Sequence, residues 1–383
     1  MNNLSINNNT SSTFFILAGE QSADNHGAIL MHFLKKLKPN AEFAGIGGKK
    51  MADEGLISIE DINKLAVMGF VEVIRHLLFF RKLTVRVLEE IQLIKPIHII
   101  LIDYPGFNLR LAKKIKLRFD IPITYYISPK LWAWKENRIE IIQKYIDQML
   151  VIFPFEKNWY KNRGVDVKFV GHPIFDEWKP AIKHDLCNGL GLNPDKPILT
   201  LFPGSRKQEL SQHLSLFISV AEKLRTINSQ IQFVLGIVPE MSLDHFQMPD
   251  WIRIERDCPQ HALECADLAL VASGSATLEA AVFGTPTLII YKMAILSWWL
   301  SKLLIKTDYA GIVNIIAGKK IMPEFLQNDA TSESITNKAL EIINSREKQE
   351  QMKSDMFNVK QKLNGMGASQ RVAQHILSFT KSK

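Results

Sequence analysis

The chain has 383 residues, of which 46% are hydrophobic and 22% are charged. This composition excludes a disordered or collagen-like chain, and at about 150 residues per domain the length predicts two domains. The net charge of +8 says little about partners until its location is known. Three cysteines do not make a disulfide framework in a chain of this length and fit a reducing compartment, so we expect a cytoplasmic protein.

The chain begins with an uncharged, asparagine-rich stretch, which predicts a disordered tail over residues 1–12. This stretch lacks the basic residues of a signal peptide, and the apolar run Phe14–Ala18 is too short for one. Nowhere do eighteen apolar residues follow one another, so we expect no membrane-spanning helix.

Short β-rich apolar runs then alternate with helical patterns. Strands are predicted at Phe14–Ala18, Phe43–Ile46, Ile97–Ile102, Ile123–Ile127 and Met149–Phe153, with helices at His26–Leu37, Val71–Ile94 and Leu109–Phe119. In the second half strands are predicted at Ile198–Phe202, Gln232–Leu235, Leu268–Val271 and Thr287–Ile290, with helices at Gln208–Leu224, Ala276–Phe283 and Ser332–Ile343. Continuous apolar strands that alternate with helices indicate parallel sheets buried on both faces.

The predicted fold class is therefore α/β, with two Rossmann-like parallel-sheet domains that face a central cleft. A cluster of prolines near residues 172–195 marks the break between the halves. We expect an N-terminal domain over 13–180 and a C-terminal domain over 181–350. Residues 351–383 would form a C-terminal helix that packs back toward the N-terminal domain.

The whole charge surplus lies in residues 64–138, which hold 14 basic and 6 acidic residues. The same window contains more apolar residues than one buried helix face needs, which favours contact with an anionic membrane surface. The candidate contact residues are Met68, Phe70, Val71, Val73, Ile74, Leu77, Leu78, Phe79 and Phe80, with Trp298 and Trp299 of the apolar run Lys292–Lys306. The alternative is a pair of buried helices with ordinary solvated lysines.

Two loops of the first half could carry chemistry. The first strand ends in Ala18–Gly27, whose small residues and following helix suit an anion, but neither this loop nor Gly45–Gly48 has the spacing of a dinucleotide-binding loop. A dehydrogenase is therefore disfavoured, and so is an ATPase with a Walker A loop. Asp103 ends a strand, where it could be a general base facing the cleft or a helix N-cap. His26 and Glu20 are the other candidate bases.

Two loops of the second half suit a phosphate. In Phe202–Glu209, Gly204 would let a phosphate approach the backbone, Ser205 could cap the next helix and Arg206 could pair with the phosphate. The alternative is an ordinary strand–helix turn. In Ala272–Pro286, a run of small residues opens a helix and offers donors from Ser273, Gly274, Ser275 and Thr277. Glu279 could accept from ribose hydroxyls or could only compensate the helix dipole.

No Asp-x-Asp motif occurs in the chain, so the metal-holding motif of one large class of sugar transferases is missing. The phosphate charge would instead fall to helix N-termini and Arg206. We therefore expect no metal and no cofactor.

Ordered motifs from residue 13 onward resemble the lipid-A-disaccharide synthase family, inverting glycosyltransferases of the two-Rossmann-domain GT-B type. The matching stretches are Ala18–Asp24, Leu65–Val73, Ile102–Asn108, Tyr126–Trp134, Phe153–Glu156, Phe169–Pro173, Pro203–Arg206, Ala272–Glu279 and Lys306–Tyr309 followed by Asn314. Any one of these stretches would be a weak match, but their number and order are highly specific.

The resemblance implies transfer of 2,3-diacylglucosamine from its UDP carrier to 2,3-diacylglucosamine 1-phosphate (lipid X). The product is a β-1′,6-linked disaccharide phosphate, made at the cytoplasmic face of the inner membrane. The implied partners are the two lipid substrates, the anionic membrane and a second copy of the chain as a homodimer. By the same resemblance Asp103 is the base, Arg206 binds the UDP phosphates, Glu279 binds the ribose and Asn314 belongs to the UDP site.

Two positions depart from the family pattern. Ala23 stands where the family usually has Gly, and Gly106 stands where many members have a second Asp. The second departure leaves Asp103 as the sole carboxylate of its motif and keeps His26 open as an alternative base.

Three other interpretations remain at this point. The chain could be another UDP-N-acetylglucosamine-using enzyme of the same fold, such as a peptidoglycan-type transferase or a 2-epimerase. It could also be a non-catalytic peripheral membrane protein. Nucleic-acid binding is disfavoured, because the basic window has an apolar context and no recognition motif.

Overall fold

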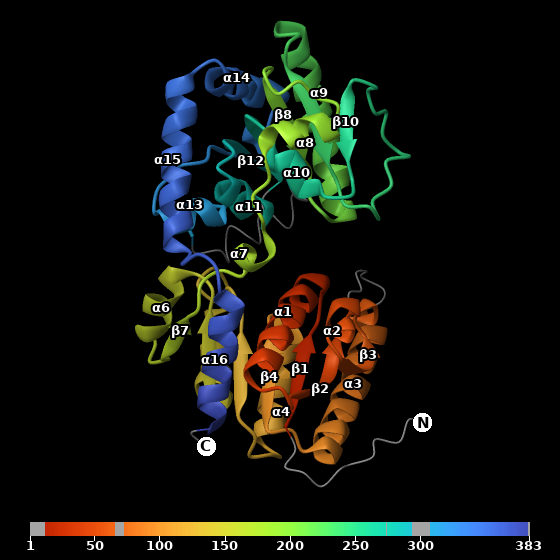
Figure 1. The fold of residues 1–383 in the computed structure, drawn as a ribbon, viewed down its shortest axis with the longest axis vertical. Coiled ribbons are helices and arrows are strands. Elements are labelled where there is room, and N and C mark those ends of the chain that lie inside the picture. The colour runs from red at the N-terminus through yellow and green to blue at the C-terminus, as the bar shows by residue number, and fades with distance from the viewer. Residues whose placement is uncertain (1–11, 66–72, 273, 293–306, 382–383) are drawn as a thin grey trace. The chain divides into compact units, whose positions relative to one another are not determined.

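The computed structural model describes residues 12–65, 73–272, 274–292 and 307–381 (Figure 1). The chain divides into two compact units. Unit 1 comprises Met1–Glu177 together with Asn364–Lys383, and unit 2 comprises Trp178–Leu363. The expected domain boundaries were 180/181 and 350/351. Each unit is built around one parallel sheet, which confirms the predicted α/β class.

Unit 1 contains a seven-stranded sheet in the order β3-β2-β1-β4-β5-β6-β7, in which every pairing is parallel. Its strands are β1 (Thr13–Ala18), β2 (Glu42–Gly47), β3 (Leu56–Asp61), β4 (His98–Ile102), β5 (Ile123–Tyr126), β6 (Gln148–Val151) and β7 (Val167–Phe169). Its helices are α1 (Gln21–Leu37), α2 (Lys49–Asp53), η1 (Ile62–Lys64), α3 (Val73–Ile94), α4 (Pro105–Lys116), η2 (Glu136–Arg138), α5 (Ile139–Tyr145), α6 (Pro154–Lys161), α7 (Ile174–Glu177) and α16 (Ala368–Lys381).

Unit 2 contains a six-stranded parallel sheet in the order β10-β9-β8-β11-β12-β13. Its strands are β8 (Ile198–Phe202), β9 (Gln232–Gly236), β10 (Ile252–Glu255), β11 (Leu268–Ala272), β12 (Thr287–Tyr291) and β13 (Glu324–Leu326). Its helices are α8 (Lys183–Gly189), α9 (Lys207–Ile227), α10 (Pro259–Glu264), α11 (Ala276–Phe283), α13 (Ile312–Ala317), η3 (Gln327–Asp329), α14 (Ser332–Ile343) and α15 (Arg346–Lys362).

The interior strands are the ones that the apolar runs predicted. Strands β1, β4, β8 and β11 are buried along their whole length, because helices cover both faces of a parallel sheet. In unit 1, α1 packs against α16, and α3 packs against α4, which packs against α5. Right-handed crossovers place α1 and α4 on opposite faces of the sheet.

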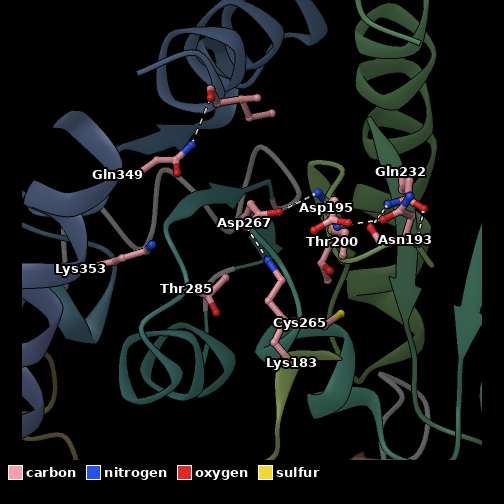
Figure 2. A network of polar contacts seen from close by, with 12 residues as sticks. Lys183, Asn193, Asp195, Thr200, Gln232, Cys265, Asp267, Thr285, Gln349 and Lys353 are labelled. Atoms are coloured by element: carbon pink, nitrogen blue, oxygen red, sulfur yellow. Dashed lines mark hydrogen bonds and ion pairs between the residues drawn. The ribbon is translucent and has the colours of Figure 1, made fainter. Parts of the chain in front are cut away.

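A polar network closes the amino ends of the unit 2 strands (Figure 2). Asp267 accepts hydrogen bonds from Lys183 Nζ at 2.6 Å and from the N–H of Ile198 at 2.9 Å. Gln232 bonds both backbone groups of Asn193, at 2.8 and 2.7 Å. These contacts hold α8 and the loop after it against the amino ends of the strands, away from their carboxyl ends.

The C-terminal region forms two helices where one was expected. Helix α15 belongs to unit 2, and α16 belongs to unit 1, where it packs against α1 (Figure 1). Asp176 accepts from the N–H groups of Gly367 and Ser369, at 2.6 and 2.7 Å, and so caps α16. Arg371 donates from Nε to the carbonyl oxygen of Val170 at 2.8 Å. These bonds fasten the returning chain to unit 1.

Helix α1 begins at Gln21, five residues before the predicted start at His26. The small residues Ala23 and Gly27, which suggested a loop, instead lie on the buried face of the helix. A Cβ at Gly27 would lie 2.5 Å from the sulfur of Met51. No helix among the described residues is long and apolar enough to cross a membrane.

Candidate active site

Residues of both predicted sites follow strands at which the sheet order reverses. In unit 1 the reversal lies between β1 and β4, and Glu20 and Asp103 follow these two strands directly. In unit 2 it lies between β8 and β11, followed by Gly204–Arg206 and Gly274–Thr277. Open parallel sheets bind their ligands beyond the carboxyl ends of the strands at such a reversal. Each unit therefore presents one candidate ligand site.

Asp103 is held on a constrained turn. Asp103 and Tyr104 both have positive φ angles, 45° and 48°, in a region that non-glycine residues rarely adopt. Tyr125 Oη donates to the Asp103 carbonyl oxygen at 2.5 Å, and Asn108 Nδ2 donates to the same atom at 2.8 Å. The N-cap of α4 is Tyr104, so the alternative interpretation of Asp103 as the helix N-cap is wrong.

The surroundings of Asp103 favour its protonated form. Burial, and next the negative charge of Glu20, raise the pKa of Asp103 to about 6. Lys130, the backbone N–H of Tyr104 and His26 act in the opposite direction. A carboxyl group with a pKa near 6 can accept a proton from a hydroxyl at neutral pH and release it afterwards. The predicted candidates Asp103, Glu20 and His26 thus lie close enough to influence one another.

A neighbouring carboxylate orients the imidazole ring of His26. Its Nδ1 lies 3.0 Å from Glu177 Oε1, which leaves Nε2 as the atom that can face a ligand. His172 lies near it: burial, and next the charge of His26, lower the pKa of His172 to about 3. His172 Nδ1 accepts from the N–H of Ile174 at 3.2 Å. His26 therefore remains a credible alternative base beside Asp103.

A buried carboxylate supports the loop that carries Lys130. Glu156 accepts from Ser128 Oγ at 2.5 Å, from Trp132 Nε1 at 3.1 Å and from the N–H of Phe153 at 3.0 Å. Burial raises the pKa of Glu156 to about 7, and its hydrogen bonds partly offset this effect. Ser128 and Trp132 lie on either side of Lys130 in the sequence. Glu156 therefore positions the loop of Lys130, and the ammonium group of Lys130 lowers the pKa of Asp103.

Two further residues of the first motif have structural tasks. Asp24 is buried and accepts from the N–H groups of Gly48, Lys50 and Met51, at 2.7, 3.1 and 3.1 Å, so it caps α2 from α1. A Cβ at Gly19 would lie 2.3 Å from the ring of Tyr104, so Gly19 admits this ring beside Glu20.

The loop Phe202–Glu209 of unit 2 is arranged differently from the prediction. Arg206 is the N-cap of α9, so Ser205 does not cap it. Glu209 Oε2 accepts from the N–H groups of Ser205 and Arg206, at 3.0 and 3.2 Å. Gly204 has a φ of 108°, and a Cβ there would lie 2.3 Å from Glu209 Oε2. The glycine therefore admits the carboxylate of Glu209, while the Arg206 side chain stays 62% exposed.

The loop before α11 offers fewer side-chain donors than expected. Gly274 and Ser275 are exposed at the helix start, where backbone N–H groups lack intrahelical partners. Thr277 is buried, and its hydroxyl donates to the carbonyl oxygen of Gly274 at 2.8 Å, so it shapes the loop. Glu279 is half-buried one turn further along the helix. Ser273 lies outside the described residues.

Asn314 is a structural clamp. Its side chain is buried, and Nδ2 donates to the carbonyl oxygen of Met322 and to Glu324 Oε1, both at 2.8 Å. Its Oδ1 accepts from the N–H groups of Ile321 and Met322, both at 2.9 Å. Both donors and both acceptor positions of the amide are thus engaged. A direct contact of Asn314 with UDP, which the resemblance implied, does not fit this geometry.

The predicted membrane-contact residues fall into three groups. Leu78 is 55% exposed on α3, whereas Phe79 and Phe80 are partly buried against the unit 1 core. The phenyl ring of Phe80 lies 5.4 Å from that of Phe107. Met68, Phe70 and Val71 lie outside the described residues, as do Trp298 and Trp299, and so do the side chains of Val73, Ile74 and Leu77.

Several site residues were not predicted. Lys130 and His172 stand inside stretches that matched the family pattern, so their motifs were visible while their roles were not. No feature of the sequence indicated a role for Glu209 or His213. His213 donates from Nδ1 to the Glu209 carbonyl oxygen at 2.7 Å and accepts from the N–H of Lys292 at 3.0 Å, which joins α9 to the end of β12.

The chain resembles known proteins over nearly its whole length. Residues 14–376 match a family model described as lipid-A-disaccharide synthetase. A lipid-A-disaccharide synthase from Coxiella burnetii (strain Dugway 5J108-111) is 36% identical over 371 residues, which cover 95% of this chain and 98% of that protein.

Solved structures share the two-sheet fold. A UDP-GlcNAc 2-epimerase from Neisseria meningitidis has a TM-score of 0.64 at 11% identity and covers 96% of this chain and 99% of its own. A calicheamicin glycosyltransferase has a TM-score of 0.57 at 14% identity, with 96% and 98% covered. The fold is thus that of two-Rossmann-domain glycosyltransferases and epimerases. With the family match over residues 14–376, the chain belongs to the lipid-A-disaccharide synthase family.

Proposed function

We propose that this enzyme transfers a 2,3-diacylglucosamine unit from UDP-2,3-diacylglucosamine to 2,3-diacylglucosamine 1-phosphate. The observation that carries the proposal is the match of residues 14–376 to the family. The acidic site of unit 1 supports it, because an inverting transfer needs a base for the acceptor hydroxyl and Asp103 has a pKa of about 6.

In this mechanism the acceptor's 6-hydroxyl oxygen attacks the anomeric carbon of the donor. The hydroxyl proton passes to Asp103, the new carbon–oxygen bond forms, and the bond from the anomeric carbon to UDP breaks with its electron pair leaving on UDP. Direct displacement from the opposite side inverts the configuration and yields a β-linkage. Lys130 favours the ionised form of Asp103 before the attack.

The donor's UDP group is assigned to unit 2. The diphosphate would contact the exposed Arg206 guanidinium and the N–H groups at the start of α11, at Gly274 and Ser275. The N–H groups of Ser205 and Arg206 stay on Glu209 in this arrangement. Glu279 would accept from the ribose hydroxyls. Thr277 and Asn314 would shape the site from within.

We place the enzyme on the cytoplasmic face of the inner membrane. The exposed face of α3 carries Leu78 and Val85, which are 55% and 53% exposed, beside the exposed Arg81 and Lys82. Aliphatic and basic residues on one helix face suit an anionic lipid surface. A homodimer is the further partner we propose, and sedimentation of the purified enzyme in neutral detergent tests it.

The decisive experiment incubates the purified enzyme with both lipid substrates, with and without EDTA, and identifies the products by mass spectrometry. We expect a tetraacyl disaccharide phosphate and UDP in equal amounts, and the same yield with EDTA. Turnover of unacylated UDP-N-acetylglucosamine without disaccharide formation would instead identify another enzyme of this fold.

Three variants test the roles of the two units. Asp103→Ala should abolish transfer while UDP-sugar binding persists, and His26→Gln should leave most of the rate if Asp103 is the base. If His26→Gln abolishes transfer and Asp103→Ala does not, the base is His26. Arg206→Ala should weaken inhibition by UDP about tenfold, as loss of a charged hydrogen bond predicts, whereas unchanged inhibition would exclude Arg206 from the diphosphate site.

A further inference from the structure

Three cationic side chains gather on unit 1 next to the loop of Asp103. This cationic cluster consists of Arg110 on α4, of Lys135 just before η2 and of Arg138 at the end of η2. Helix α4 packs against α5, which continues from η2, and this packing brings Arg110 toward the other two. Arg110 Nε donates to the carbonyl oxygen of Gly106 at 2.7 Å, which fixes its guanidinium at the first turn of α4.

No carboxylate neutralises this cluster among the residues that the structure describes. Glu136, which stands between Lys135 and Arg138 in the sequence, instead lies 2.7 Å from Arg163 Nε. Burial, and next the charges of Arg138 and Arg110, hold the pKa of Lys135 below its usual range. Three like charges without a counter-charge form a site that an anion would stabilise.

The surroundings of the cluster suit an anion that is joined to an apolar molecule. The ammonium nitrogen of Lys135 lies 4.2 Å from the ring centre of Trp134, and this tryptophan is 44% exposed. An exposed indole beside a cation is typical of surfaces that meet lipid headgroups. On the other side of Arg110, a Cβ at Gly106 would meet nothing within 4 Å, so this side of the loop is open.

We propose that the cationic cluster binds the phosphate monoester of the glycolipid acceptor and thereby directs the acceptor's hydroxyl toward Asp103. The inference rests on the proposed function and assigns the part of unit 1 that selects a phosphorylated acceptor. Guanidinium groups suit phosphate because their paired N–H donors match its oxygens. The phosphate is on C1 and the 6-hydroxyl is on C6, which is bonded to C5; C1 and C5 flank the ring oxygen, so the phosphate site should lie near the base without coinciding with it.

The test compares acceptor kinetics of the double variant Arg110→Gln/Arg138→Gln with those of the wild type. The assay uses micelles of neutral detergent that contain both substrates and no phospholipid. We expect the KM for the phosphorylated acceptor to rise at least tenfold, while the KM for the UDP-sugar stays within twofold. With the dephosphorylated acceptor, 2,3-diacylglucosamine, wild type and variant should have the same low kcat/KM.

A matched control removes two charges from the same helices without touching the cluster. Lys114 on α4 and Lys144 on α5 are exposed, and Lys114→Gln/Lys144→Gln should leave the acceptor KM within twofold. Arg110→Lys/Arg138→Lys keeps the charge and loses the paired donors, so its acceptor KM should lie between the other two. Equal thermal midpoints of all variants would show that each one folds.

The outcomes separate this inference from the proposed function. If the wild type forms no disaccharide, the proposed function fails. If the wild type turns over and the double variant keeps its acceptor KM, the cluster is not the phosphate site. An equal rise of KM for phosphorylated and dephosphorylated acceptors also overturns the inference. The inference is also overturned if the double variant keeps its acceptor KM in micelles but binds anionic vesicles more weakly than the wild type, because the cluster would then be a phospholipid site.

Discussion

Asp103 combines two features that are unfavourable for folding and useful for catalysis. Its backbone adopts a positive φ, and its carboxyl group is buried near Glu20. Strained backbone and a raised pKa concentrate at functional sites, because the surrounding structure has to enforce them. Here Tyr125 and Asn108 enforce the turn through the Asp103 carbonyl oxygen.

The pH dependence of the reaction should follow Asp103. With a pKa of about 6, its carboxyl group is mostly protonated below pH 5 and cannot accept the hydroxyl proton. We expect kcat/KM to rise about tenfold per pH unit below pH 6 and to level off above pH 7. Initial rates from pH 4.5 to 8.5 measure this profile. A profile that is flat down to pH 5 would contradict the assignment of Asp103 as the base.

Asp103→Asn should be inactive yet more stable at high pH. The pKa is 3.8 in the unfolded chain and about 6 in the folded one. The folded state therefore retains a proton that the unfolded state has released, and the free energy of unfolding of the wild type falls as the pH rises through this window. At pH 8 the variant should be more stable by up to about 3 kcal/mol, and at pH 3 the gap should close. Urea unfolding at both pH values measures it, and an equal gap at both would contradict the burial effect.

At the scale of secondary-structure elements, one side chain, that of Asp24, joins helices α1 and α2. Asp24 on α1 accepts three N–H groups at the start of α2, and these groups have no partner within the helix itself. The same contacts order Gly48, which directly follows β2, because a Cβ there would lie 2.6 Å from Asp24 Oδ2. The acidic residue of the first motif thus builds the edge of the site without facing a ligand.

Asp24→Asn should destabilise the protein by about 1–3 kcal/mol, because an amide nitrogen would face an N–H donor in a buried place. Asp53→Asn, at the exposed end of α2, is the matched control and should change stability by less than about 0.5 kcal/mol. Urea unfolding followed by circular dichroism compares the two. Equal stabilities of the two variants would show that the three hydrogen bonds contribute little.

At the scale of the whole molecule, the charge distribution has one dominant feature. The net charge of residues 64–138 equals that of the entire chain, and α3 in this window exposes aliphatic and basic side chains together. Phe80 of α3 packs against Phe107, which follows Asp103 by four residues, so the basic helix adjoins the loop of Asp103. A lipid surface at α3 would thus lie beside the site that receives a lipid substrate.

Arg81→Gln/Lys82→Gln should weaken binding to vesicles with anionic lipids. Each basic residue near such a surface contributes about 1 kcal/mol, so we expect a loss of roughly tenfold or more at physiological salt. Vesicle flotation measures it. Lys179→Gln/Lys196→Gln removes the same charge from unit 2 and should bind as the wild type does. If both double variants bind alike, α3 is not the contact surface.

The sequence alone determined the architecture of the sheet interiors and which loops follow the interior strands. All nine predicted strands are present, because a strand covered on both faces needs a continuous apolar run that is visible without the structure. The four strands that the sequence did not reveal, β3, β7, β10 and β13, are the edges of the two sheets, where no such run is needed. Asp103 and Arg206 are candidates from the sequence because loops after interior strands are where ligands of such sheets bind.

Only the tertiary structure decided what the loop residues do. Asn314 and Thr277 look like ligand-binding residues in the sequence, yet their side chains are engaged by other groups of the protein itself. Glu156 and Lys130 stand inside stretches that matched the family pattern, but their roles were not visible in the sequence, because these roles arise from contacts with Ser128 and Asp103 in other parts of the chain. A strand follows from its own residues, whereas the partners of a polar side chain depend on segments that are distant in the sequence and meet only when the chain folds.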